Sequence, residues 1–96
     1  MDYLEKCYQK DPNMVSRKIA DEFILVPIRQ NVGDLESIYT LNETAARIWE
    51  LIDGKIKVRD IKERIVEEFE VKEEAAESDL IQLIDDFGKI QAIEEV

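Results

Sequence analysis

The chain has 96 residues, the size of a single domain, and its 45% of hydrophobic residues is enough for one small core. Its 23 acidic and 13 basic residues give a net charge of −10, which disfavours binding to the phosphate backbone of nucleic acids. Because it has no histidine and one cysteine, the sequence excludes a Cys/His zinc site and an internal disulfide, and it lacks the commonest general base.

The same residues predict where the protein resides. No apolar run reaches the roughly 18 residues that span a bilayer, and residues 1–11 carry charges where a secretory signal would be apolar. The lone Cys7 fits a reducing compartment. We therefore expect a soluble, cytoplasmic protein that makes no membrane contact.

Residues 1–13 are polar, with scattered apolar side chains. The sequence Asp11-Pro12-Asn13 breaks any helix there, because proline disfavours helical backbone at the residue before it. We expect residues 1–13 to form an N-terminal arm, either frayed or docked on a partner subunit. Residues 14–96 then form the domain.

Three short strands are predicted next. Residues 15–20 alternate in character, and residues 23–26 (FILV) are an apolar run rich in strand formers. Turn-forming residues, including Asn31 and Gly33, fill residues 30–35, and residues 36–40 (ESIYT) suggest a third strand. Strands in immediate succession predict an antiparallel meander.

From Leu41 onward the apolar spacing becomes helical. Asn42 is a good N-cap for a first helix, and Gly54 is expected to close it in a left-handed conformation. Apolar stripes predict a second helix over residues 58–69 and a third over residues 73–90. Ile93 and Val96 suggest a last extended piece.

Strands followed by helices predict an α+β fold, in which three helices cover one face of the sheet. The short link between the first two helices makes the arrangement resemble a winged helix-turn-helix. The second helix has four acidic and three basic residues, and the third has six acidic residues against one lysine. Since a recognition helix needs basic side chains, DNA binding is disfavoured.

Catalytic chemistry is also missing from the sequence. Adjacent carboxylates such as Asp85 and Asp86 lie on polar helix faces, where nothing moves their pKa toward neutrality. Cys7 has no histidine to activate it, and neither a calcium-binding loop nor a phosphate-binding glycine loop is present. We expect no enzyme activity, no metal site and no cofactor.

One segment carries a family resemblance. Residues 39–54, YTLNETAARIWELIDG, resemble the signature of the PqqD family, named for protein D of pyrroloquinoline quinone biosynthesis, and the similarity extends over about residues 15–96. Two positions depart from the family pattern: Lys57 stands where a threonine often caps the second helix, and Gln91 stands where glycine is usual after the third. Residues 1–13 have no counterpart.

The resemblance implies a non-catalytic peptide chaperone, also called a RiPP recognition element. Such a protein binds the leader of a ribosomally made precursor peptide and presents it to a modifying enzyme, often a radical SAM enzyme. The quinone is the product of the pathway that names the family and need not bind.

The resemblance also implies a binding site, because an extended leader can add a strand to a free sheet edge. We expect one wall of the site on the third strand and the other on the third helix, and the acidic third helix is expected to favour basic leader residues. Of the helix residues, Leu80, Ile84 and Phe87 also fit the core stripe, whereas Ile81 lies off it. The candidate residues are Ser37, Ile38, Tyr39 and Thr40 on the strand, and Leu80, Ile81, Ile84 and Phe87 on the helix.

Other functions stay open at this point. The strongest alternative is a protein-interaction or scaffold module of the same fold that reads no leader. A DNA-binding winged helix and a small-molecule enzyme rank below it. A homodimer also stays open, because an arm and a free sheet edge both permit strand exchange.

Overall fold

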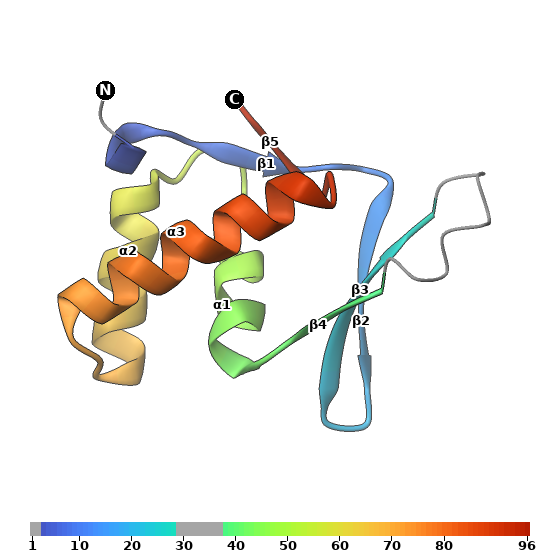
Figure 1. The fold of residues 1–96 in the computed structure, drawn as a ribbon, viewed down its shortest axis with the longest axis horizontal. Helices are drawn as coiled ribbons and strands as arrows, with labels where there is room; N and C mark the ends of the chain where they lie inside the picture. Colours follow the sequence, from blue (N-terminus) through green and yellow to red (C-terminus); the bar gives the residue numbers. More distant parts are fainter. Residues whose placement is uncertain (1–2, 29–37) are drawn as a thin grey trace.

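The computed structural model has the α+β architecture that the sequence predicts, with helices packed beside a small sheet (Figure 1). The structure describes residues 3–28 and 38–96. In chain order the elements are the 3-10 helix η1 (Tyr3–Glu5), strands β1 (Tyr8–Lys10), β2 (Met14–Ile19), β3 (Glu22–Pro27) and β4 (Tyr39–Leu41), helices α1 (Glu43–Leu51), α2 (Val58–Phe69) and α3 (Glu73–Lys89), and strand β5 (Ile93–Glu95).

Strands β2, β3 and β4 form an antiparallel sheet with β3 in the middle, which confirms the predicted meander. The β2–β3 loop has two residues, and the first of them, Ala20, has a φ of 55°. The sequence predicts the third strand over residues 36–40, whereas the structure shows β4 at Tyr39–Leu41. Residues 36 and 37 lie outside the described part of the chain.

Helices α1 and α3 lie against one face of this sheet, whereas α2, contrary to the predicted cover of three helices, packs on α1 and α3 on the side away from the sheet (Figure 1). Leu25 of β3 and Leu41 of β4 lie on the covered face and are buried. On β2, Met14 is buried, but Ile19 at the other end of the strand is 58% exposed. The apolar alternation of β2 therefore does not lead to burial along the whole strand, because the β2–β3 hairpin extends past the helices (Figure 1).

Helix α1 begins where the sequence predicts. The Asn42 side chain accepts a hydrogen bond of 2.8 Å from the backbone N–H of Ala45, which satisfies one of the donors that a helix start leaves unpaired. The helix ends at Leu51, earlier than the predicted closure at Gly54. Gly54 does have a φ of 84°, and its N–H donates to the carbonyl of Tyr8, so this glycine shapes the turn after the helix.

Helix α2 has the predicted bounds, and α3 ends one residue before the predicted end. The buried side chain of Lys62 joins the two helices by donating to Glu73 at 2.9 Å and to Glu77 at 3.4 Å. The hydrogen bond to Glu73 is the main reason that the pKa of Lys62 is raised. These two acidic residues of α3 therefore serve helix packing.

The backbone after α3 is left-handed at Gln91, with a φ of 59°. This is the position where the family resemblance leads one to expect glycine. The N–H of Ala92 donates to the carbonyl of Phe87 at 2.8 Å, so the chain turns back on the helix. The helix end thus has the conformation that suits glycine, although a glutamine occupies it.

The N-terminal residues are folded against the domain. Strand β1 pairs antiparallel with β5, and the N–H of Asp11 donates to the carbonyl of Ala92 at 2.8 Å. The hypothesis of a frayed arm is therefore wrong for residues 3–13, because their partner strand is supplied by the far end of the chain. The expected extended piece near the C-terminus is confirmed over Ile93–Glu95.

The core lies among α1, α2 and α3 and continues to the sheet through Met14, Leu25 and Leu41. Phe87 of α3 is fully buried, and its ring meets the ring of Trp49 edge to face at a centroid distance of 5.5 Å. Trp49 is 3% exposed, which agrees with a packing role. Among the helices of the described residues, none is long and apolar enough to cross a membrane.

Helices α1 and α2 are also joined by a two-pronged ion pair. Arg47 donates through Nε and Nη2 to the two carboxylate oxygens of Glu68, at 2.7 and 2.9 Å. This pairing lowers the pKa of Glu68 from its ordinary value of 4.5. The pKa of Glu68 is lower in the folded state than in the unfolded state, so the ion pair stabilises the fold fully when the pH is above the ordinary pKa. This stabilisation is lost as the pH falls through the lowered pKa of the folded state.

We expect Glu68→Gln to destabilise the protein at neutral pH, with a difference from wild type that shrinks as the pH falls below the ordinary pKa. Urea unfolding midpoints at about pH 7, 5 and 3.5 measure this difference. Glu67→Gln is the control, because Glu67 is exposed and makes no ion pair with Arg47. A Glu68→Gln deficit that is equal at all three pH values would contradict the assignment.

Candidate functional site

Strand β4 is an edge of the three-stranded sheet. On one side it pairs with β3, in the register Phe23 to Leu41 and Leu25 to Tyr39. Within residues 3–28 and 38–96, no strand pairs with its other side. An edge strand of this kind presents backbone N–H and C=O groups that can form a ladder with another extended chain.

A hollow of about 280 Å³ lies at the end of β4, between the start of α1 and the side of α3. Its apolar lining comes from Ala45 and Ile48 of α1 and Leu83 of α3. Its polar lining consists of Asn42, Thr44, Asp79, Gln82 and Asp86, and among residues 3–28 and 38–96 no lysine or arginine lines it. We call this space the β4–α3 hollow.

Tyr39 links β4 to α3 at this hollow. Its hydroxyl donates to Oδ2 of Asp86 at 3.2 Å, and its ring packs edge to face on Phe87 with a centroid distance of 6.0 Å. Burial, and then the negative charge of Asp86, raise the pKa of Tyr39. The tyrosine is therefore held as a neutral hydrogen-bond donor, and it fixes the distance between the edge strand and the helix.

The strand residues of the predicted site differ in their exposure to solvent. Tyr39 is half-buried, whereas Thr40 and Ile38 are exposed, Ile38 by 48%. Ile38 directly precedes β4 and is not part of it. Ser37 lies outside the described residues.

Three of the four helix residues of the predicted site lie in the core. Leu80, Ile84 and Phe87 are 1%, 3% and 0% exposed, so their side chains are not open to a ligand. Phe87 still supports the site from beneath, because the ring of Tyr39 packs on it. The packing role that the apolar stripe suggests for these three residues agrees with their burial.

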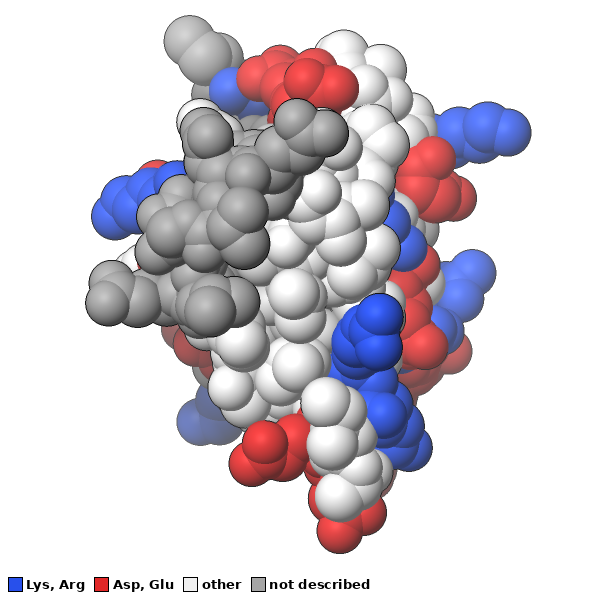
Figure 2. All heavy atoms as spheres, turned by 90° about the vertical axis from the view of Figure 1, so that its right-hand side faces the viewer, with Lys and Arg blue, Asp and Glu red and all other residues white. Residues whose placement is uncertain are grey.

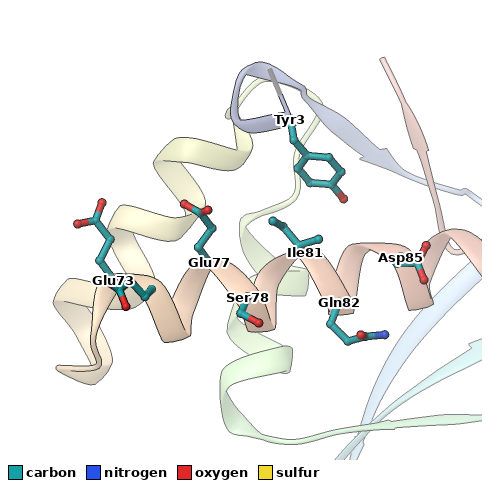
Figure 3. A pocket seen from close by; sticks show the side chains of 8 residues that line it. Tyr3, Glu73, Glu77, Ser78, Ile81, Gln82 and Asp85 are labelled. Atoms are coloured by element: carbon teal, nitrogen blue, oxygen red, sulfur yellow. The ribbon is translucent and has the colours of Figure 1, made fainter. Parts of the chain in front are cut away.

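Ile81, the fourth helix residue, is 37% exposed but lies on the other flank of α3. Figure 3 shows its side chain pointing toward the ring of Tyr3, whereas Gln82 points the other way. Ile81 lines a second hollow of about 660 Å³ with Tyr3, Asp85 and other residues of α3, and Gln82 lines both hollows. The structure therefore does not bring Ile81 to the β4–α3 hollow.

The residues of α3 that do line the β4–α3 hollow are absent from the predicted site. They are Asp79, Gln82, Leu83 and Asp86. Their spacing of i, i+3, i+4 and i+7 places them on one side of the helix, next to the core stripe. This spacing is visible in the sequence, but the sequence does not say which flank of the helix faces β4.

The chemistry that this site can offer follows from its described side chains. Among the described residues, no group of three or more His, Cys, Asp or Glu side chains is placed to hold a metal ion. Cys7 lies far along the chain from the hollow residues and contacts the carbonyl of Lys55. What the site offers is a free strand edge, an apolar lining and carboxylates.

Comparison with known proteins supports this description of the fold. A search of curated proteins finds no match. Among solved structures, the chain is similar to TbiB1 in complex with the TbiA(beta) leader peptide, with a TM-score of 0.72 and 22% sequence identity, over 90% of this chain and 94% of that one. At this level of identity the similarity shows a shared fold. Residues 22–93 match the family described as coenzyme PQQ synthesis protein D, and the chain therefore belongs to the PqqD family.

Proposed function

We propose that this protein is a non-catalytic peptide chaperone. It binds the leader of a ribosomally made precursor peptide as a strand added to β4, and it presents that peptide to a modifying enzyme of the radical SAM type. The observation that carries the proposal is the free edge of β4, which lies beside a hollow with an apolar lining. Main-chain hydrogen bonds to β4 supply affinity, and the hollow supplies selectivity.

The family and the similar structure support the peptide as the ligand. The chain belongs to the PqqD family, and TbiB1, which shares its fold, was solved in complex with a leader peptide. A leader that is disordered when free loses conformational entropy on binding, so moderate affinity is expected. In this proposal the protein is cytoplasmic, binds no nucleic acid and needs no cofactor, and its assembly as a homodimer stays open.

The proposed site differs from the sequence-based one on its helix side. Its strand wall keeps Tyr39 and Thr40 of β4 and Ile38 just before them, while Ser37 stays a sequence-based prediction. On α3, the side chains that can touch a bound peptide are those lining the β4–α3 hollow. Leu80, Ile84 and Phe87 hold the wall in place from the core.

The proposal is tested by titrating the isotope-labelled protein with a synthetic peptide that has the sequence of a candidate precursor leader. We expect amide shifts in the NMR spectrum to concentrate on Tyr39–Leu41 and on α3 around Gln82. A peptide of the same composition in scrambled order is the control and should shift these amides far less. Shifts confined to β1 and β5, with β4 unchanged, would contradict strand addition.

A second candidate, a scaffold that reads no leader, is favoured by a different surface. Ile19, Ile28 and Ile38 are exposed by 58%, 55% and 48%. Figure 2 shows a broad uncharged area on the side of the molecule formed by the sheet, with charged residues at its margins. Exposed apolar areas often mark protein interfaces. If a modifying enzyme shifts the amides of β2 while leader peptides shift none of β4, the scaffold function is the correct one.

A further inference from the structure

The acidic residues of α3 have different surroundings, although the sequence presents them as one charged face. Glu73 and Glu77 bind Lys62 and so belong to the contact between α2 and α3. Asp85 pairs with Lys89 at 3.2 Å and lines the hollow that contains Tyr3 (Figure 3). Two other carboxylates of this helix, Asp79 and Asp86, line the β4–α3 hollow.

No lysine or arginine of the described residues neutralises these two carboxylates inside the hollow. Asp86 accepts hydrogen bonds from Tyr39 and Gln82, which are uncharged donors. The start of α1 also faces the hollow, but a helix N-terminus carries only about half a positive charge and Glu43 lies in its first turn. Two full negative charges therefore outweigh the positive end of the helix, and the hollow is electronegative.

We propose that the hollow selects a lysine or arginine of the bound leader, read by Asp79 and Asp86. This inference rests on the proposed function, because it concerns a residue of the peptide added to β4. The backbone of a strand added to β4 lies about 4.8 Å beyond β4. From there a long side chain of the added strand can reach the hollow. Its methylene groups can cover Ile48 and Leu83 while its charged end reaches a carboxylate.

The positions of the two aspartates explain how one basic residue is accommodated. Asp79 and Asp86 are seven residues apart on α3, which is about two helical turns or roughly 10 Å. A lysine binds one of them as a point charge, and an arginine can bind either of them with two hydrogen bonds. The preference is therefore for a basic residue at one peptide position, and not for a generally basic peptide.

The test uses a displayed library of random dodecapeptides selected on the folded full-length protein. We expect selected peptides to carry lysine or arginine at one position within an otherwise uncharged, strand-forming segment. Selection on Asp79→Asn combined with Asp86→Asn is expected to lose that enrichment, and selection on Asp79→Asn alone is expected to weaken it. A selected lysine peptide should bind Asp79→Asn about threefold to tenfold more weakly than wild type, as expected for partly exposed charge pairs.

Asp85→Asn is the matched control, because it removes the same charge from the other flank of α3 and should keep the enrichment. Far-ultraviolet circular dichroism verifies that each variant is folded. The inference is overturned, while strand addition stands, if the peptides that shift the β4 amides have no position enriched in lysine or arginine. It is also overturned if that enrichment is equally strong in selections on the two variants of the hollow. If no selected peptide shifts the β4 amides, the proposed function itself fails.

Discussion

Replacing Phe87 with alanine is expected to lower the free energy of unfolding by about 3–5 kcal/mol, because it removes a fully buried ring and leaves a cavity. The ring also contacts Trp49 and Tyr39, so its loss weakens the contact between α3, α1 and β4. Urea unfolding followed by circular dichroism measures the change.

The control for this prediction is Ile81→Ala on the same helix. Ile81 is 37% exposed, so its truncation is expected to cost less than about 1 kcal/mol. The comparison distinguishes the contribution of the buried side of α3 to stability from that of its exposed flank. Similar losses in the two variants would mean that the buried and exposed sides of α3 are misassigned.

Leu25→Ala is expected to lower the free energy of unfolding by about 2–5 kcal/mol. Leu25 lies in the central strand β3, is fully buried, and is paired in register with Tyr39 of β4. A cavity beneath this pair is also expected to loosen β4, so peptide binding should weaken in the same variant. Urea unfolding gives the first quantity, and the NMR titration with a leader peptide gives the second.

Ile24→Ala, one residue earlier on the same strand, is the matched control. Side chains alternate between faces along a strand, so Ile24 lies on the face opposite Leu25, and it is only partly buried. Its truncation is expected to cost much less than that of Leu25. Equal losses would show that both faces of the sheet are covered, which would also remove the open surface on which the scaffold alternative depends.

The helices were predictable because their signals are local. Side chains three or four residues apart share one helix face, so the spacing of apolar residues predicts both the helix and its buried side. Asn42 could be identified as an N-cap because its partner, the N–H of Ala45, is three residues away. Neither prediction requires any knowledge of distant parts of the chain.

The N-terminal strand was not predictable in this way. The sequence of β1, YQK, has no apolar alternation that would indicate a strand, and its partner β5 lies at the opposite end of the chain. Whether a strand lies at the edge of a sheet likewise depends on which other segments pair with it. That β4 is an edge strand follows from where β3 lies and from which neighbours the described residues supply.

Ile81 shows the limit of helix periodicity as a guide to the site. The sequence correctly indicates that Ile81 lies off the core stripe, but both flanks of α3 lie off that stripe. The direction in which α3 crosses α1 determines that Asp79 and Leu83 line the β4–α3 hollow beside the start of α1, whereas Ile81 faces Tyr3. A helical pattern contains no information on that direction.

The sequence by itself determined the order of β2–β4 and α1–α3, the approximate bounds of these elements, the family and the excess of negative charge. Local hydrogen bonding and the spacing of apolar side chains are sufficient for these. The tertiary structure decided that the N-terminal residues pair with the C-terminal strand, that one edge of β4 has no partner among the described strands, and that two aspartates of an acidic helix line a hollow at the end of β4. Those features depend on how distant segments pack, because burial and charge pairing are properties of neighbours in space.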